Sequence, residues 1–575
     1  MNILNTLAGI GAEQRTRRFF LVIAVLLGFL QAWTSRMDLV NDTVSYLDIG
    51  DGVWHGNWLV VVNGLWGPLY GIILGAATNL LKPSVDWEYP LVHSVIYAIF
   101  LFSLWSFDFF LREFISLRRE RESADELSVP AWVWLMIGYT LFLWSALQLI
   151  QVSETNPDML VAAFVYLTAG LLIRVKRGVA GWPAYLTMGV MLGLGYLTKL
   201  IMFPVSLICL TALFAIGKRR PVQCLAAVAA FSALAAPFIV ALSLEKGRVT
   251  FGESGRYNYA VHVSHVPRTH WQGETAGCGE PLHATRQIFD HPATFEFGTP
   301  VSGAYPAWTD PSYWYDGVRC RVDVRHVVGN TATLLRTEAL FFFELHGSIV
   351  AALFILFYAS GRKWAILEDL LAYWFLLLPA IAALCIYALI HIEPRYLGPF
   401  LVTFLLCLYF SVHLRASEGH ARLYSAIAVL LLAMYFVPIE TSSLHIKAFV
   451  DDVAGRSKID PDSPEEIAKA MYQLGLRPGD RIASLEYSLY NTSTWARLAR
   501  VEIIAEVYYW PTLSESAAND FWKASPATQG MVIQAIGKTG ARVIVSQMPP
   551  TPSDASGWRR VGKTDYYAYW LHRTT

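Results

Sequence analysis

Long apolar runs are the feature that most constrains how this chain can fold. A helix needs about 20 apolar residues to cross the hydrocarbon core of a bilayer. Eleven stretches meet or approach that length, near 19–35, 89–111, 130–150, 158–174, 180–198, 201–217, 222–243, 337–359, 368–390, 396–414 and 423–438. The sequence therefore predicts a polytopic α-helical membrane protein with about eleven transmembrane helices.

The composition agrees with a membrane protein and gives no support to nucleic-acid binding. Of 575 residues, 55% are hydrophobic and 16% are charged, whereas a soluble domain carries about 25% charged residues. Lys plus Arg and Asp plus Glu both number 45, so the formal net charge is zero. A nucleic-acid-binding surface is typically basic, and we expect no nucleic-acid partner.

Basic residues in the short loops predict which way the helices cross the membrane. On one side they are numerous: Arg15, Arg17 and Arg18; Arg112, Arg118, Arg119 and Arg121; Arg174, Lys176 and Arg177; Lys218, Arg219 and Arg220; Arg362 and Lys363; Arg415 and Arg422. The short loops on the other side hold only Arg36, Lys82, Lys199 and Arg395. Because Lys and Arg concentrate in cytoplasmic loops, we expect a cytoplasmic N-terminus. With an odd number of spans, the C-terminus then lies outside.

Two apolar segments need separate treatment. Phe19–Trp33 follows three arginines, as in a signal peptide, but no clear small-residue cleavage site follows it, so we expect an uncleaved first helix. Pro68–Leu81 is too short to cross a bilayer, at about 14 residues. Counting it as a span would also invert every later loop. We predict a helix that lies along the outer surface.

These spans predict two domains. Residues 1–440 form a transmembrane domain, whose outer loops include 36–88, with surface helices, and the large loop 244–336. The large loop is rich in Gly, Pro and aromatic residues. Loops of this length are usually functional or disordered, and the aromatic content argues against disorder. Residues 455–575 form a separate soluble domain.

The soluble domain alternates helix-like and strand-like segments. Helices are predicted over 464–474, 494–498 and 528–539, and strands over 481–485, 501–507, 541–546 and 566–571. This alternation indicates a small α/β domain with a largely parallel sheet. About 120 residues are enough for one core.

Asp42 is the first candidate for catalysis. It lies just outside the first span, at the start of a predicted helix that runs to about Trp54. Its carboxylate could cap that helix, act as a general base at the membrane face, or do both. Tyr46 lies one turn further on the same face, whereas Asp48 and Asp51 are predicted to be solvated.

Four polar residues at later span boundaries are further candidates. Glu154 and Asp158 lie in a turn between two spans, where Asp158 could cap the next helix or form an acidic wall of a cavity. Lys199 ends a span, and it could extend to the headgroups or face the same cavity. Arg395 follows Pro394 between two spans, where its guanidinium could bind a phosphate through paired donors.

The cysteines and histidines predict no metal site. Cys278 and Cys320 lie in one polar loop and could pair as a disulfide in an oxidising compartment or remain thiols. The other cysteines lie in apolar runs and are expected to be buried thiols. The spacings of His262, His265, His270 and His283 match no standard metal site. No nucleotide-binding glycine loop and no Ser or Cys nucleophile motif is present.

In chain order, these residues resemble the motifs of the GT-C superfamily of membrane glycosyltransferases, and most of all the protein O-mannosyltransferases and the lipid A aminoarabinose transferase. Asp42 and Gly67-Pro68-Leu69-Tyr70 resemble the acidic residue and the Pro-Pro-Leu-Tyr-like surface helix of the family's first outer loop, with Gly in place of the first Pro. Pro157-Asp158, Leu197-Thr198-Lys199 and Glu393-Pro394-Arg395-Tyr396 are similar to its later motifs. The likeness covers roughly residues 15–415.

The resemblance implies an enzyme that transfers a monosaccharide from a polyprenyl-phosphate donor to a glycan, lipid or protein acceptor, with inversion and with no cofactor or metal required. Asp42 would be the general base, and Lys199, Arg395 and Tyr396 would bind the donor phosphate. The residues expected near the sugar or the acceptor are Tyr46, Tyr70, Glu154, Asp158 and Glu393. In the large loop, Tyr257, Trp308 and Trp314 are candidates for stacking on a sugar, although structural packing is the favoured role for any one of them.

Two other functions stay open. A transporter or flippase of a lipid-linked glycan typically has internal repeats of its spans and charges at mid-membrane. The third reading is a non-catalytic scaffold that binds a cell-wall partner. The sequence has no visible repeat, and its candidate residues gather at the outer boundary, which favours the enzyme. We expect it among the lipids of a bacterial inner membrane, with the soluble domain in the periplasm.

Overall fold

The computed structural model describes most of the chain. The segments outside it are residues 1, 122–128, 268, 274–275, 284, 299–302, 314, 321–323, 326–327, 330, 333–335, 337–362, 413–442, 458–459, 509–519, 549–555 and 572–575. The chain forms two compact units. We call them the helical unit, Met1–Arg36, His93–Gly255 and Asp323–Gly455, and the mixed unit, Met37–Val92, Arg256–Val322 and Arg456–Thr575.

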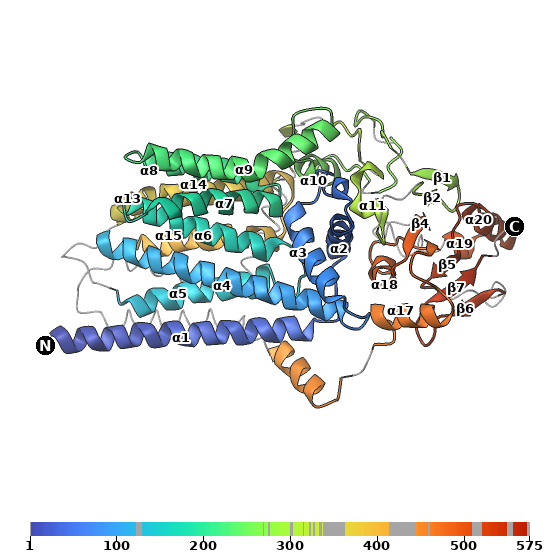
Figure 1. Ribbon diagram of the computed structural model, residues 1–575, viewed down its shortest axis with the longest axis horizontal. Helices are drawn as coiled ribbons and strands as arrows, with labels where there is room; N and C mark the ends of the chain where they lie inside the picture. Colours follow the sequence, from blue (N-terminus) through green and yellow to red (C-terminus); the bar gives the residue numbers. More distant parts are fainter. Residues whose placement is uncertain are drawn as a thin grey trace. The chain divides into compact units, whose positions relative to one another are not determined.

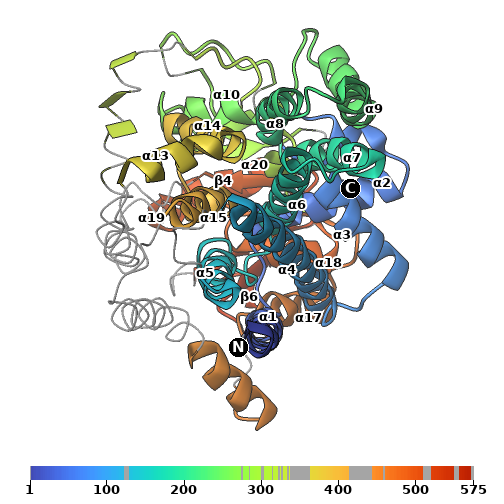
Figure 2. The same cartoon turned by 90° about the vertical axis from the view of Figure 1, so that its left-hand side faces the viewer.

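Long helices that run alongside one another make up the helical unit (Figure 1), and Figure 2 shows several of them nearly end-on. They are α1 (Asn2–Thr34), α4 (Glu88–Arg121), α5 (Ala131–Trp144), α6 (Asp158–Lys176), α7 (Trp182–Thr198), α8 (Met202–Ile216), α9 (Pro221–Glu245), α13 (Lys363–Ala372), α14 (Trp374–Ile390) and α15 (Pro394–Phe410). The π-helical turn η2 (Ser145–Leu149) follows α5. Prolines stand in the first turn of α7, α9 and α15, where the missing N–H costs nothing.

The predicted spans can be compared with these helices. Two of them, 337–359 and 423–438, lie outside the described residues. Each of the others coincides with a helix or, over 130–150 and 368–390, with two consecutive helices. Among the described residues, five helices are long and apolar enough to cross a membrane, or six if the bent pair Ile366–Ala372 and Trp374–Ile390 is one span. Most of the sequence's apolar runs are therefore helices, as predicted.

In the mixed unit, two helices pack through glycine. Helix α2 runs over Asn41–Trp54, the 3-10 turn η1 over Trp58–Val61, and α3 over Pro68–Leu81. A Cβ added to Gly50 or to Gly75 would overlap the backbone of the facing helix. Only glycine allows this close approach, so α2 and α3 are held in a definite register.

The same unit contains one sheet, in the strand order β1-β2-β4-β3-β5-β7-β6. Its strands are β1 (Arg286–Phe289), β2 (Thr294–Glu296), β3 (Arg481–Ser484), β4 (Glu502–Val507), β5 (Val543–Ser546), β6 (Trp558–Arg560) and β7 (Tyr567–Trp570). Helices α17 (Pro464–Gln473), α18 (Thr492–Ala499), α19 (Asp520–Lys523) and α20 (Pro526–Gly537) accompany it. The small α/β domain predicted for the C-terminal part is confirmed.

The sheet differs from the prediction in two ways. Only β4, β3 and β5 are parallel, and all other pairings are antiparallel, so the prediction of a largely parallel sheet is wrong. Strands β1 and β2 come from the large loop, with Phe295 of β2 facing Glu506 of β4. The loop also contains α10 (Ser254–His262), α11 (Pro306–Thr309) and the 3-10 turn η3 (Pro311–Tyr313). Strands this short leave no clear alternation in the sequence.

Candidate functional site

Three predicted residues from separate loops meet in the helical unit. The Nζ atom of Lys199 lies 2.5 Å from Oδ1 of Asp158. The same Nζ atom lies 3.5 Å from the centroid of the Tyr396 ring, within the range of a cation–π contact. Three residues that together span more than 200 positions of the sequence, at the ends of α6, α7 and α15, thus form one cluster.

Local sequence explains these positions. Helix α6 has Pro157 as its N-cap and Asp158 as its first residue. The side chain of Asp158 makes no capping hydrogen bond and pairs with Lys199 instead. Helix α7 ends at Thr198, and Lys199 is extended, which turns the chain toward α8. Of the two roles predicted for Asp158, the cavity wall fits better than the cap.

Arg395 is held beside this pair by Glu393. Its Nε atom lies 2.5 Å from Oε2 of Glu393, and Nε2 of His391 lies 3.0 Å from Oε1. Burial opposes ionisation of Glu393, but the hydrogen bond from His391 and the charge of Arg395 lower its pKa to about 2. The Tyr387 and Tyr396 rings stack with centroids 5.0 Å apart. Glu393 therefore serves as an anchor for Arg395 in this structure.

The cluster, which we call the Lys199 cluster (Asp158, Lys199, Glu393, Arg395 and Tyr396), combines two cations with two carboxylates. Burial lowers the pKa of Lys199, the Asp158 carboxylate raises it, and nearby Arg395 lowers it further. The side chains of Lys199 and Arg395 keep 21% and 17% exposure. Two partly exposed cations of this kind suit an anion that carries more than one charge, such as phosphate.

A small apolar cavity of about 30 Å³ lies among the helices whose ends form the cluster. It is lined by residues of α6, α7, α8, α14 and α15, among them Thr168, Leu192, Met202, Phe375 and Phe400. The lining is almost entirely apolar, so a hydrocarbon group fits this interior better than a polar one.

In the mixed unit, Asp42 lies in the first turn of α2 and its side chain is half-buried. The N-cap of α2 is Val40 and makes no side-chain bond, so the predicted capping role of Asp42 is wrong. Instead, the indole Nε1 of Trp308 donates to Oδ1 of Asp42 over 3.1 Å. Trp308 belongs to α11 in the large loop, and the sequence alone offered no sign of this contact.

Aromatic rings surround this bond. The Tyr46 ring meets those of Tyr70 and Trp66 edge-on, at 4.9 Å and 5.1 Å, and Trp66 donates from Nε1 to the carbonyl of Trp308. Tyr46 and Tyr70 are 4% and 0% exposed. Both rings pack in this structure, so a sugar contact with either would require them to open. Tyr257 is also buried, at 5%.

Two other residues predicted from the sequence, Glu154 and Trp314, remain. Glu154 is half-buried in the turn that precedes α6, and its amide donates to the carbonyl of Gln151. Trp314 lies outside the described residues.

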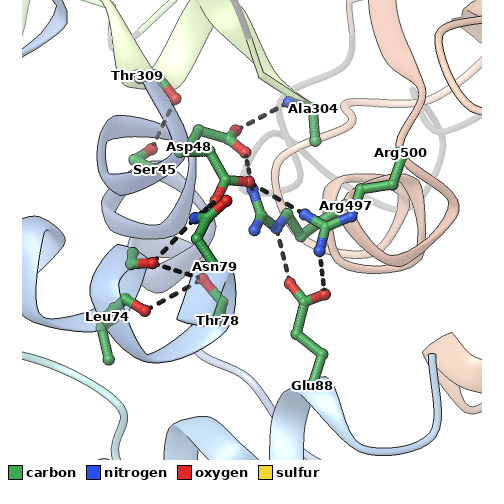
Figure 3. Close-up of polar contacts among 12 residues, drawn as sticks. Ser45, Asp48, Leu74, Thr78, Asn79, Glu88, Ala304, Thr309, Arg497 and Arg500 are labelled. Carbon is green, nitrogen blue, oxygen red and sulfur yellow. Dashed lines mark hydrogen bonds and ion pairs between the residues drawn. The ribbon is translucent and has the colours of Figure 1, made fainter. Parts of the chain in front are cut away.

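A second charged cluster, not predicted, surrounds Arg497 of α18 (Figure 3). Its Nη1 atom lies 2.8 Å from Asp48 and 2.7 Å from Asp51, and Nε lies 2.9 Å from Glu88. Arg500 reaches Glu88 over 2.6 Å and Asp51 over 3.1 Å. We call these five residues the Arg497 cluster. The prediction that Asp48 and Asp51 are solvated is wrong, because Asp48 is only 3% exposed and Asp51 is bound by two arginines.

The environment of this cluster sets its charges. Burial raises the pKa of Asp48 to about 6, although Arg497 and the Ala304 amide favour its ionised form. Burial also opposes ionisation of Asp51, but Arg497, Arg500 and Asn79 together hold its pKa below the usual value. A cavity of about 300 Å³ lies alongside, lined in part by His55, Asn57 and Glu502.

The sequence contained one signal of this cluster: Asp48/Asp51 and Arg497/Arg500 share the i, i+3 spacing that places each pair on one helix face.

The structure also describes the two cysteines and a buried histidine of the large loop. Cys278 and Cys320 are both free thiols in this structure, but their segments pair, since the Arg319 amide donates to the Cys278 carbonyl. Their disulfide stays a prediction. His270 is buried, with Nε2 2.7 Å from Oε1 of Glu506. Within the described ranges, no three His, Cys, Asp or Glu residues are grouped to hold a metal.

The two halves of the predicted active site fall in different units. Asp42 belongs to the mixed unit, and Lys199 and Arg395 belong to the helical unit. Their meeting around one substrate remains a prediction.

Comparison with known proteins bears on the fold. No protein-family model matches the sequence, and neither does any curated protein. Among solved structures, apo ArnT from Cupriavidus metallidurans is similar with a TM-score of 0.50 and 13% identity, over 96% of this chain and 97% of that one. The same protein bound to undecaprenyl phosphate gives 0.51 and 12%, with the same coverage.

The archaeal oligosaccharyltransferase AglB from Archaeoglobus fulgidus, in complex with an inhibitory peptide and a dolichol-phosphate, gives a TM-score of 0.47 at 12% identity, over 92% of this chain and 69% of that one. The likeness to ArnT extends over nearly the whole of both chains. The chain therefore has the GT-C fold that its motifs predicted.

Proposed function

We propose that this protein is an inverting glycosyltransferase that moves a monosaccharide from a polyprenyl-phosphate donor to a glycan, lipid or protein acceptor. The observation that carries the proposal is the Lys199 cluster. Lys199, Asp158 and Tyr396 were predicted from separate motifs, and Asp158 and Tyr396 each lie within contact distance of Lys199. This convergence on a GT-C fold supports a single binding site for an anionic group.

Lys199 and Arg395 are the proposed ligands of the donor phosphate. Phosphate is a good leaving group that needs no protonation, so catalysis requires chiefly the stabilisation of its developing charge. Asp158 and Glu393 orient the two cations before the donor binds. ArnT has been crystallised with undecaprenyl phosphate, a lipid of the proposed donor class.

Asp42 is the proposed general base. It accepts the proton of an acceptor hydroxyl while that oxygen forms a bond to the anomeric carbon, and the bond from this carbon to the phosphate oxygen breaks on the opposite face. A single displacement of this kind inverts the configuration. The hydrogen bond from Trp308 aims the carboxylate, and general-base catalysis typically contributes about 10²–10⁴-fold in rate.

The proposed location is a bacterial inner membrane, with a cytoplasmic N-terminus and the mixed unit in the periplasm. The basic short loops support this orientation. The reaction would then occur at the outer leaflet.

Purified protein in liposomes tests this function. It is supplied with a panel of polyprenyl-phosphate monosaccharides and acceptors, and release of polyprenyl phosphate is followed. We expect turnover with at least one donor and a loss of about 10²–10⁴-fold in Asp42→Asn. Lys218→Met removes an exposed lysine and is the matched control for Lys199→Met. Wild-type protein that releases no polyprenyl phosphate from any donor would falsify the proposal, and full activity of Asp42→Asn would remove Asp42 from the mechanism.

A further inference from the structure

We infer that Arg497, in the C-terminal part of the chain, is a positioning residue for Asp42. It acts through Asp48 and through the segment Gly303–Thr309 of the large loop. The inference rests on the proposed function for the role of Asp42. All of its contacts lie within the mixed unit.

The first step is the burial of Arg497 among acidic residues. Its side chain is 3% exposed and contacts Asp48 and Asp51 on α2 and Glu88 at the start of α4. Asp48 and Glu88 are equally buried. Removal of the guanidinium would leave buried carboxylates without a counter-charge, which is a strongly unfavourable state. Arg497 is therefore needed for α2 to keep its place.

The second step is the double contact of Asp48. Its Oδ1 atom faces Arg497, and its Oδ2 atom accepts the amide hydrogen of Ala304 over 2.8 Å, as Figure 3 shows. Gly303 has a positive φ of 102°, and a Cβ there would overlap the Asp48 carboxylate. The carboxylate thus packs directly on the backbone of the large loop, and glycine is required at this position.

The third step runs from Ala304 to Asp42. Helix α11 follows directly, and its Thr309 hydroxyl is 3.2 Å from that of Ser45, while Trp308 donates to Asp42. Asp42, Ser45 and Asp48 follow one another at i, i+3 and i+6, and so lie along one face of α2. The loop segment is fastened to this face at three points.

Together these contacts form a continuous connection. Arg497 fixes Asp48, Asp48 fixes the start of the loop segment, and the end of that segment directs the Asp42 carboxylate through Trp308. The amide of Ile503 in β4 also donates to the carbonyl of Ala304, which ties the segment to the sheet. Since a misplacement of about 1 Å at a catalytic group can cost about 10²-fold in rate, the C-terminal domain becomes part of the catalytic apparatus.

A double-mutant cycle on the full-length protein in liposomes tests this connection. Arg497→Gln and Trp308→Phe are each expected to lower kcat by about tenfold or more, with the donor KM changed by less than about twofold. The double variant should lose little beyond either single variant, because both interrupt one connection. Arg497→Lys should restore part of kcat. Arg481→Gln, at an exposed arginine of β3, should behave as wild type.

Losses that multiply in the double variant would overturn the inference, as would an Arg497→Gln effect confined to KM. If Arg497→Gln does not fold, Asp48→Asn replaces it in the cycle with the same expectation.

Hydrogen exchange supplies a readout independent of turnover. In Arg497→Gln, or in Asp48→Asn where the former does not fold, amides of 303–309 and of the first turns of α2 should exchange faster, and those of α20 should not change. Unchanged exchange in 303–309 would overturn the inference even if the proposed function holds. Faster exchange there in a protein without any donor turnover would keep the connection and reject only the function.

Discussion

The Lys199 cluster and the Arg497 cluster contain the same kinds of side chain and differ in how they are balanced. In the first, two cations face two carboxylates, and Lys199 and Arg395 remain partly exposed. In the second, Arg497 is enclosed by three carboxylates at 3% exposure. A partly exposed cation can exchange or share its partner with an incoming anion, whereas a buried one cannot be released without a large desolvation penalty. The first arrangement suits a ligand site and the second suits a structural connection.

The largest effect expected from this difference is on stability. Arg497→Met should lower the free energy of unfolding of the mixed unit by about 3–5 kcal/mol, because it leaves buried carboxylates uncompensated. Thermal unfolding of the full-length protein in detergent measures the loss, and hydrogen exchange of α2 and α18 assigns it to this unit. Arg481→Met is the matched control, since its partner Glu502 lies 3.6 Å away on the surface. Equal losses of unfolding free energy in Arg497→Met and Arg481→Met would contradict the structural role that separates the Arg497 cluster from the Lys199 cluster.

The next effect is on activity. Lys199→Met should lower donor turnover by about 10²–10³-fold, the usual loss when one stabilising donor is removed from a developing charge. Its melting temperature should fall by less than that of Arg497→Met, because Lys199 compensates one buried carboxylate, Asp158, whereas Arg497 compensates two, Asp48 and Glu88. Steady-state kinetics and thermal unfolding of the same preparation check both parts. A large loss of stability with little loss of turnover would make the Lys199 cluster structural.

A smaller effect is expected at Tyr396, whose ring lies under the Lys199 ammonium. Tyr396→Leu removes a cation–π contact of about 1–2 kcal/mol, which should weaken donor binding by about tenfold. Tyr396→Phe keeps the ring and should bind the donor nearly as wild type. The KM for the donor distinguishes the two variants, and equal KM values would exclude a role for the ring.

The smallest effect concerns a third acidic environment, at Glu486 beyond β3. Burial raises its pKa to about 7, against hydrogen bonds from Ser546 and the Gln547 amide. A carboxyl with a raised folded-state pKa stabilises the fold at low pH, and this contribution is lost as pH rises through about 7. Wild-type protein should therefore lose about 1 kcal/mol between pH 6.5 and pH 8 that Glu486→Gln does not lose.

Thermal unfolding at several pH values measures this difference, with Glu502→Gln on β4 as the control. Identical pH profiles for wild type and Glu486→Gln would show that Glu486 titrates normally.

The contrast between the clusters also shows how far sequence reasoning reaches. The Lys199 cluster could be predicted because its residues stand at the ends of apolar runs, next to Pro157 and Pro394, where local composition marks the helix boundary. Asp158 and Lys199 meet because α6 begins, and its neighbour α7 ends, on the same side of the helical unit.

The Arg497 cluster could not be predicted in the same way. Arg497 and Asp48 are 449 positions apart, and their pairing depends on how α18 packs on α2. Strands β1 and β2, of four and three residues, are likewise defined by their pairing with the C-terminal sheet. Local sequence therefore fixed where helices end, while long-range contacts decided which charged residues are buried.

Direct titration with polyprenyl phosphate tests the central distinction most simply, because it needs no knowledge of the sugar or the acceptor. Wild type, Lys199→Met and Arg497→Gln are compared in detergent or nanodiscs. We predict that Lys199→Met weakens binding by about tenfold or more and that folded Arg497→Gln binds as wild type. Unaltered binding by Lys199→Met, together with weakened binding by Arg497→Gln, would contradict the account.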